Sequence, residues 1–220
     1  NKIKVFYSQF IKKVHATKSI EEAELVKNFE NCQRDHNIAL MNELSILCDK
    51  KNINIKNVLN ACETKWNFNK YKPGLVGGHC ISIDPYYLIE YSKKFNFNFS
   101  TLLLSRQVNE NFIKYNKKKI LNYLLKLKVT YKDKILFIGV TYKKNVDDTR
   151  NSGAYKIINS MQKKYTNIDI YDPLINKNKI NKINNYKAII IFHLHNLIFK
   201  DKKFIKNLQN NKKVLNLTFS

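Results

Sequence analysis

The chain has 220 residues, of which 44% are hydrophobic and 12% aromatic, and its formal net charge is +23. This hydrophobic content is enough for folded cores and excludes a globally disordered protein. The most apolar run, 188–192, is far too short to cross a bilayer and no signal-peptide pattern is found, so we expect a cytoplasmic protein with no membrane partner.

The first 128 residues are predicted to be almost entirely helical. Residues 2–10 alternate loosely between apolar and polar, as in a strand or in the approach to a helix. Ser19 followed by Glu22 is typical of a helix start, and the spacing of the apolar residues behind them predicts one long helix, or two nearly continuous ones, over 20–51. Further helices are expected over 55–61, 84–95 and 100–128.

From Tyr131 onward, strands alternate with helices. Residues 134–140 form an apolar run that reaches a glycine near its end, as in a buried parallel strand. Such a series is typical of a βαβ sheet, which binds its ligands at the carboxyl ends of the strands. After the first strand we expect a helix and three further strands, over 152–164, 168–173, 188–192 and 214–217.

The change of pattern divides the chain into domains. We predict an α-helical central domain over 15–128 and a Rossmann-like α/β domain with a mainly parallel sheet over 129–220. Residues 1–14 are interpreted as an entry segment.

The excess of basic residues suits either a nucleic acid or a small polyanion such as a nucleotide diphosphate. Because the lysines are spread over the whole chain without a nucleic-acid-binding motif, we expect no nucleic-acid partner. The cysteines form no CxxC pair and lack histidines at zinc-site spacing, so we expect reduced thiols and no metal site; they are Cys32, Cys48, Cys62 and Cys80.

The segment 77–85, with the sequence GGHCISIDP, is the most informative part of the chain. Glycines allow close backbone approach, and a cysteine beside such a turn with a carboxylate nearby is a candidate nucleophile. Asp84 and Pro85 also suit the N-cap and first position of a helix. The alternative for Cys80 is a buried structural thiol.

Two other clusters can carry chemistry. Lys27 and Asn31 are four residues apart and share one helix face, although a solvated surface explains them equally well. The loop 141–152 follows the first strand of the α/β half, where a doubly wound sheet binds its ligand, and it combines an aromatic residue with lysines and an arginine. Its alternative is a charged surface loop.

Together these clusters resemble the UDP-glucose/GDP-mannose dehydrogenase family, most closely the branch that oxidises UDP-N-acetylhexosamines for bacterial polysaccharides. His79 and the stretch 64–68 favour an N-acetylated sugar by this resemblance. The segments that carry it are 23–31, 33–35, 37–40, 64–68, 72–88, 141–143 and 150–152.

The resemblance implies NAD-dependent oxidation of a sugar 6-hydroxyl to a carboxylate. Cys80 would be the nucleophile that forms a thiohemiacetal and then a thioester. Lys27 would stabilise negative charge on the sugar oxygen, with Asn31 as its hydrogen-bonding companion. Asp84 would manage the proton or the hydrolytic water.

The resemblance also implies a substrate site and partners. Arg150, like Cys80, would lie close to the nicotinamide cofactor, and the helical domain would form a homodimer. The UDP-sugar would be gripped by Tyr71, Lys72, Pro73, Gly74, Leu75, Val76 and Gly77, with its uridine and phosphate end held by Tyr142 and Lys143.

The sequence also departs from the family pattern. It contains no GxGxxG motif, the family's catalytic glutamate and threonine cannot be assigned, and Asn216-Leu217-Thr218 stands where many members have an acidic residue and an arginine. We therefore expect a partial enzyme, in which 1–14 is a remnant of the NAD-binding domain and a separate NAD-binding chain is a candidate partner. The alternative is a catalytically inactive UDP-sugar-binding or dimerisation module.

Overall fold

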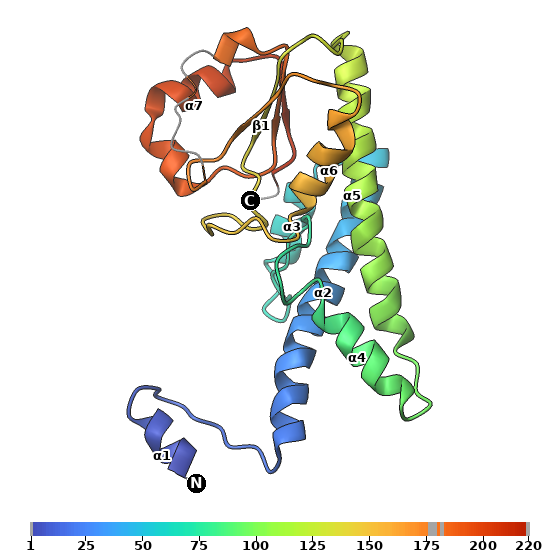
Figure 1. Ribbon diagram of the computed structural model, residues 1–220, viewed down its shortest axis with the longest axis vertical. Coiled ribbons are helices and arrows are strands. Elements are labelled where there is room, and N and C mark those ends of the chain that lie inside the picture. The colour runs from blue at the N-terminus through green and yellow to red at the C-terminus, as the bar shows by residue number, and fades with distance from the viewer. Residues whose placement is uncertain (1, 176–179, 181–182, 219–220) are drawn as a thin grey trace.

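The computed structural model describes residues 2–175, 180 and 183–218. A helical part comes first and an α/β part follows, as Figure 1 shows. The outer ends of the predicted domains, residues 1 and 219–220, lie outside the described residues. The helices of the first part are α1 (Lys2–Ser8), α2 (Ile20–Lys50), α3 (Ile55–Cys62), α4 (Asp84–Lys93) and α5 (Ser100–Lys126).

Two long helices, α2 and α5, lie side by side and form the axis of the helical part, with α4 packed against both (Figure 1). The predicted long helix is therefore one continuous element. Its start is capped as expected, because the Ser19 hydroxyl accepts a hydrogen bond from the Glu22 N–H at 3.2 Å. The Glu22 carboxylate accepts the Lys18 N–H at 2.8 Å, which satisfies a second free backbone donor.

Two local predictions needed the structure. Residues 2–8 are helical and stand apart from the rest of the molecule (Figure 1), which decides between the two readings of that segment. The N-cap of α4 is Ile83 and not Asp84, which is the first helical residue with Pro85 behind it. Asp84 still favours the helix start, because its negative charge complements the amino-terminal end of the helix dipole.

The α/β part contains a four-stranded sheet with the order β2-β1-β3-β4, in which every neighbouring pair is parallel. This confirms the predicted fold class. The elements are β1 (Ile135–Ile138), α6 (Gly153–Gln162), β2 (Ile168–Tyr171), η1 (Ile183–Asn185), β3 (Ala188–Ile191), η2 (Asn196–Lys200), α7 (Lys202–Gln209) and β4 (Val214–Asn216).

Alternate residues of the central strands enter two different hydrophobic cores. Ile135 and Phe137 of β1 face the core shared with α6 and with the carboxyl-terminal half of α5. Leu136 and Ile138 face the core under α7. Because α5 belongs to the helical part yet helps to cover the sheet, the two parts are joined through a common core.

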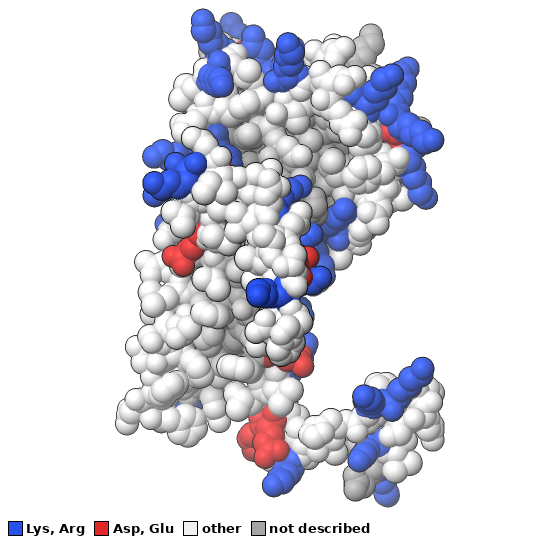
Figure 2. All heavy atoms as spheres, turned by 180° about the vertical axis from the view of Figure 1, so that it is seen from behind, with Lys and Arg blue, Asp and Glu red and all other residues white. Residues whose placement is uncertain are grey.

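The surface of the molecule is unevenly charged. On the face opposite to that of Figure 1, basic side chains gather over the α/β part, while a broad area of the helical part carries few charges (Figure 2). Within the described residues, no helix combines the length and the apolarity needed to span a membrane.

Candidate functional site

The glycine pair before Cys80 packs directly onto the loop that follows β1. A Cβ atom on Gly77 would lie 2.7 Å from the carbonyl oxygen of Asn151 and 2.9 Å from the Cβ of Tyr142. Only glycine allows this approach without displacing a backbone. The close packing explains why the sequence has no side chain at this position.

Hydrogen bonds from Gly78 join the same two loops. Its N–H donates to the carbonyl of Arg150 at 3.0 Å, and its carbonyl accepts the side-chain amide of Asn151 at 3.2 Å. Its φ of +82° is a conformation that side chains rarely adopt. The cysteine segment and the loop after β1, predicted separately, therefore form one structural unit.

Cys80 is exposed at the turn that leads into α4. Its carbonyl accepts the N–H groups of Ile83 at 2.9 Å and Asp84 at 2.8 Å, so the cysteine is held by the helix start. The structural alternative applies instead to Cys32 and Cys48, which are buried. Burial and, to a lesser extent, the charge of Asp84 raise the pKa of Cys32 to about 11, which makes it a poor nucleophile.

Asn31 and Asp84 meet across 53 residues of sequence. The side-chain amide of Asn31 donates to the Asp84 carboxylate at 2.6 Å. Lys27 does not join them: its ammonium pairs with Glu30 at 3.4 Å, and both side chains are exposed. The structure thus brings three of the four predicted catalytic residues to one helix start and leaves Lys27 apart.

Arg150 lies at the edge of this unit and forms a two-pronged contact with Asp148, at 3.0 and 2.7 Å. The hydrogen bonds from Arg150 lower the pKa of Asp148 to about 2. The Asp148 carboxylate in turn raises the pKa of Arg150, with smaller contributions from Tyr142 and Cys80. The guanidinium is therefore within electrostatic reach of the exposed thiol.

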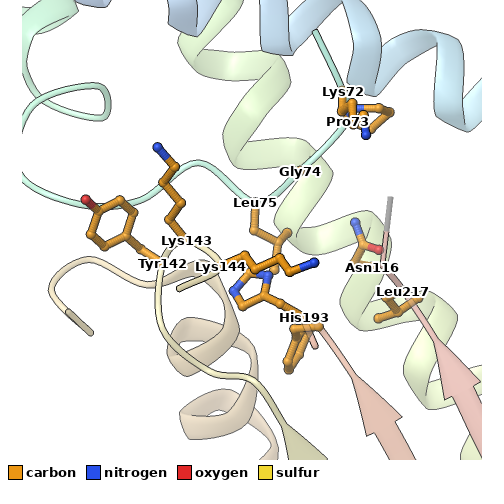
Figure 3. Close-up of a pocket in the computed structure, with 11 residues that line it drawn as sticks. Lys72, Pro73, Gly74, Leu75, Asn116, Tyr142, Lys143, Lys144, His193 and Leu217 are labelled. Carbon is orange, nitrogen blue, oxygen red and sulfur yellow. The ribbon is translucent and has the colours of Figure 1, made fainter. Parts of the chain in front are cut away.

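A pocket of about 200 Å³ opens beside this unit, at the carboxyl ends of β1 and β3. The strand order reverses between these strands, and such a crevice is the usual ligand site of an open parallel sheet. Figure 3 shows Lys144 extending across the pocket below Leu75, with Asn116 and Leu217 on its far side. The lining residues are Lys72, Pro73, Gly74, Leu75, Asn116, Tyr142, Lys143, Lys144, Phe192, His193 and Leu217.

His193 contributes a neutral polar wall to the pocket. Burial lowers its pKa, and its Nε2 donates to the Thr141 carbonyl at 2.5 Å. The positive charges at the pocket come from lysines on two segments, namely Lys72 before the glycine turn and Lys143 and Lys144 after β1. A site with basic residues, an aromatic ring and apolar walls suits a nucleotide diphosphate.

Two family models together match more than half of the chain. The central-domain model of the UDP-glucose/GDP-mannose dehydrogenase family matches residues 21–111, and its UDP-binding-domain model matches residues 136–215. The chain belongs to the UDP-glucose/GDP-mannose dehydrogenase family. The predicted resemblance is thereby confirmed.

Individual relatives agree with this assignment. Protein CapL of Staphylococcus aureus is 41% identical over 170 residues, which are 77% of this chain and 40% of that protein. The UDP-N-acetyl-D-glucosamine 6-dehydrogenase of Salmonella typhi is 35% identical over 198 residues, 84% of this chain and 47% of the enzyme. The solved structure of a UDP-D-ManNAc dehydrogenase from Pyrococcus horikoshii superposes with a TM-score of 0.81 at 27% identity and covers 98% of this chain and 51% of that one. The chain thus spans about half the length of these proteins.

The residues predicted to bind substrate divide into two groups. Lys72, Pro73, Gly74 and Leu75 line the pocket together with Tyr142 and Lys143. Tyr71, Val76 and Gly77 do not line it, although Gly77 holds the two loops together. Lys144, which also lines the pocket, belongs to the predicted loop 141–152 although it was not singled out there. Four further lining residues were not predicted, namely Asn116, Phe192, His193 and Leu217.

One of the unpredicted pocket residues carried a usable signal. His193 comes directly after the strand beside β1, where the carboxyl-end rule for parallel sheets places ligand-binding groups. Asn116 lies in the middle of α5 and had no such signal, because helical spacing does not reveal which turn of a long helix passes a pocket.

Proposed function

We propose that this chain binds a UDP-sugar, specifically a UDP-N-acetylhexosamine by analogy with its relatives, and supplies the catalytic cysteine for oxidation of the sugar 6-hydroxyl to a carboxylate. The hydrogen bond from the Gly78 N–H to the Arg150 carbonyl carries the proposal, because it joins the segment of the exposed Cys80 to the loop that lines the pocket. A UDP group in the pocket would have its phosphates near Lys143 and Lys144, with the sugar directed toward Cys80.

The chain's own residues have defined parts in this reaction. The Sγ of Cys80 adds to the aldehyde carbon while the C=O π bond opens, and the thiol proton passes to the former carbonyl oxygen, which becomes the thiohemiacetal hydroxyl. After oxidation, water attacks the thioester, the C–S bond breaks, and the carboxylate and the free thiol are released. Asp84, oriented by Asn31 at 2.6 Å, is the carboxylate that would take a proton from that water. Lys27 would have to leave Glu30 to stabilise the oxyanion.

NAD, the hydride acceptor of this chemistry, fits the described residues only in part. Two glycines have positive φ, Gly78 and Gly139, but a Cβ on either would strike protein atoms, so neither leaves an open cradle for a dinucleotide phosphate. Arg150, whose pKa is raised mainly by Asp148 and slightly by Cys80, is the residue that we propose to contact the cofactor. We propose that NAD is carried mainly by a further domain or by a separate chain.

The proposal extends to a cytoplasmic homodimer formed through the helical part. Large apolar side chains lie exposed along the two axial helices, among them Leu40 and Leu47 on α2 and Leu104 on α5. The helical part also carries a broad area with few charges in Figure 2, which suits an interface between two copies. Sedimentation velocity of the wild type and of Leu47→Glu tests the dimer.

The position of Lys27 favours the second candidate function, a UDP-sugar-binding module without catalysis. Its ammonium is paired with Glu30 and solvated, so it is not held beside the Asn31–Asp84 pair. In that case UDP-sugar would bind, but no NAD-binding partner would restore turnover.

A reconstitution experiment separates the two candidates. The chain is mixed with the amino-terminal NAD-binding domain of a related dehydrogenase, and NADH formation is followed with UDP-N-acetylglucosamine and UDP-N-acetylmannosamine. The catalytic proposal expects turnover that is lost in Cys80→Ser and kept in Cys62→Ser, the matched control. UDP binding without turnover in any mixture would support the binding module and exclude the catalytic proposal. If calorimetry detects no UDP binding, both candidate functions are refuted.

A further inference from the structure

A buried acid and a buried histidine lie under the loop that lines the pocket, and the reaction proposed above does not use them. Asp172 follows β2 and His195 follows β3, and both side chains are fully buried. The His195 Nε2 lies 2.9 Å from the Asp172 carboxylate. Neither residue lines the pocket, so neither can touch a ligand there.

The two side chains hold the two ends of the loop 141–145. Asp172 accepts the N–H groups of Val140 at 2.8 Å and Thr141 at 3.3 Å, where the loop leaves β1. The Nδ1 of His195 lies 2.8 Å from the N–H of Asn145, where the loop ends. Asn145 is further held at a φ of +61°, with its side-chain oxygen accepting the N–H of Asn196 at 2.8 Å.

These contacts fix the protonation pattern of the imidazole. A backbone N–H can only donate, so the Nδ1 of His195 must accept and carries no proton. The Nε2 therefore carries the proton and donates it to Asp172. Burial raises the pKa of Asp172, but hydrogen bonds from His195 and the backbone outweigh it and keep the pKa below its usual value.

Between the two clamped ends stand Tyr142, Lys143 and Lys144, all of which line the pocket. A short loop fixed at both ends has few ways to place the side chains in its middle. We propose that Asp172 and His195 are a positioning pair, which sets the place of the two lysines for a nucleotide diphosphate. The inference rests on the proposed UDP site and adds to it residues that act through the loop and not through the ligand.

The test compares variants that differ in what they offer the loop. His195→Gln keeps one donor and one acceptor, whereas His195→Phe keeps a ring and offers neither. Asp169→Asn is the control for Asp172→Asn, because Asp169 lies on β2, three residues before Asp172, and accepts the Tyr186 hydroxyl at 2.8 Å without lining the pocket. Dissociation constants for UDP and for UMP are measured by calorimetry on the whole chain.

We expect His195→Phe and Asp172→Asn to weaken UDP binding about tenfold or more and UMP binding much less, since the misplaced lysines serve the second phosphate. His195→Gln and Asp169→Asn should stay within about threefold of the wild type. A purely structural role would lower the binding of both nucleotides equally, through the fraction of folded protein, and that result would overturn the proposal. Wild-type affinity for UDP in His195→Phe would overturn it as well.

Measurements on the wild type keep the inference testable if the variants do not fold. Nitrogen-15 shifts should show His195 with a bare Nδ1 and a protonated Nε2, and the Asn145 amide should exchange with solvent more slowly than those of Lys143 and Lys144. A protonated Nδ1, or equally fast exchange at the three amides, would refute the clamp. A wild type with the clamp but without UDP affinity would refute the proposed function and the nucleotide role of the pair, while leaving the clamp itself established.

Discussion

The side-chain amide of Asn42 holds both backbone polar groups of Gly74. Its oxygen accepts the Gly74 N–H at 2.9 Å, and its nitrogen donates to the Gly74 carbonyl at 3.1 Å. The same nitrogen donates to Asn109 on α5 at 2.8 Å. One fully buried side chain on α2 therefore fixes the segment that leads from the pocket to Cys80.

Replacement of Asn42 should destabilise the fold strongly. Asn42→Ala leaves the Gly74 backbone and the Asn109 side chain short of partners, at a cost of about 2–4 kcal/mol in the free energy of unfolding. Asn42→Asp should cost at least as much, because its second oxygen would face two acceptors. Urea unfolding checks both, with Asn37→Ala, whose amide bonds only the Gln33 carbonyl of its own helix, as the control. An Asn42→Asp variant as stable as the wild type would contradict the assigned hydrogen bonds.

Gly77 and Gly74 should respond differently to the same substitution. Gly77→Ala forces a methyl group to within 2.7 Å of a carbonyl oxygen, so the two loops must separate, and UDP affinity should fall about tenfold or more. A Cβ on Gly74 has nothing within 4 Å, so Gly74→Ala should leave the two loops packed together and should destabilise the fold less than Gly77→Ala does. Calorimetry with UDP measures the affinity of Gly77→Ala. Urea unfolding of both variants makes the comparison, and equal losses of stability would show that the close packing is not what matters.

Asn31→Ala tests the contact with Asp84. The variant removes a short hydrogen bond to a carboxylate, but water can take its place at the half-buried Asp84. We therefore expect the free energy of unfolding to fall by about 1–2 kcal/mol. In the reconstituted reaction the variant should lower kcat more than it raises KM, because Asn31 and Asp84 act in hydrolysis of the thioester. Gln33→Ala, an exposed change on the same helix, is the control. Unchanged kcat would remove Asn31 from the proposed mechanism.

The helix and strand pattern was readable from the sequence because it depends on local signals. Ser19 and the recurring apolar residues marked the start and the face of α2, and the uninterrupted apolar run marked β1 as buried on both sides. The segment 2–8 was ambiguous, since a short alternating stretch suits either element when nothing packs against it. The division at 128–129 stays a prediction.

The contacts that shape the site were not readable in this way. Lys27 and Asn31 share a helix face as predicted, yet only Asn31 reaches Asp84, because side-chain direction and the position of α4 decide the partner. Asn42 is polar, as residues at the surface usually are, and yet it is fully buried. Helical spacing identifies a face, but it does not reveal that a polar residue on that face will find its partners inside.

The pH dependence of Asp148 gives a prediction for the loop after β1. Hydrogen bonds from Arg150 lower the pKa of Asp148 from 3.8 to about 2, so between these values the folded chain binds fewer protons than the unfolded chain. The stabilisation by this group is therefore present above pH 3.8 and lost as the pH falls toward 2. Carboxyl NMR titration should give this low pKa in the wild type and a raised one in Arg150→Gln. Arg34→Gln, which removes an exposed charge from α2, should leave it low.

At the buried ion pair between Arg106 and Asp35, replacing one partner should lower the free energy of unfolding more than replacing both. The two groups lie 2.6 Å apart and are almost fully buried, yet within the described part of the chain the Asp35 Oδ2 and the Arg106 Nε have no hydrogen-bond partner. Arg106→Met leaves a buried carboxylate uncompensated and should cost about 3–5 kcal/mol. The double variant with Asp35→Leu should recover most of this loss, because two apolar side chains need no partners.

A pH series distinguishes this account from a simple packing defect. Burial raises the pKa of Asp35, so the folded state retains its proton to higher pH than the unfolded state does. Without the opposing charge of Arg106 the pKa rises further, and the stability of Arg106→Met should fall as the pH rises through that value. The double variant lacks the carboxyl group and should not show this fall. Urea unfolding of both variants from acidic to neutral pH decides, since a packing defect would give the same loss at every pH.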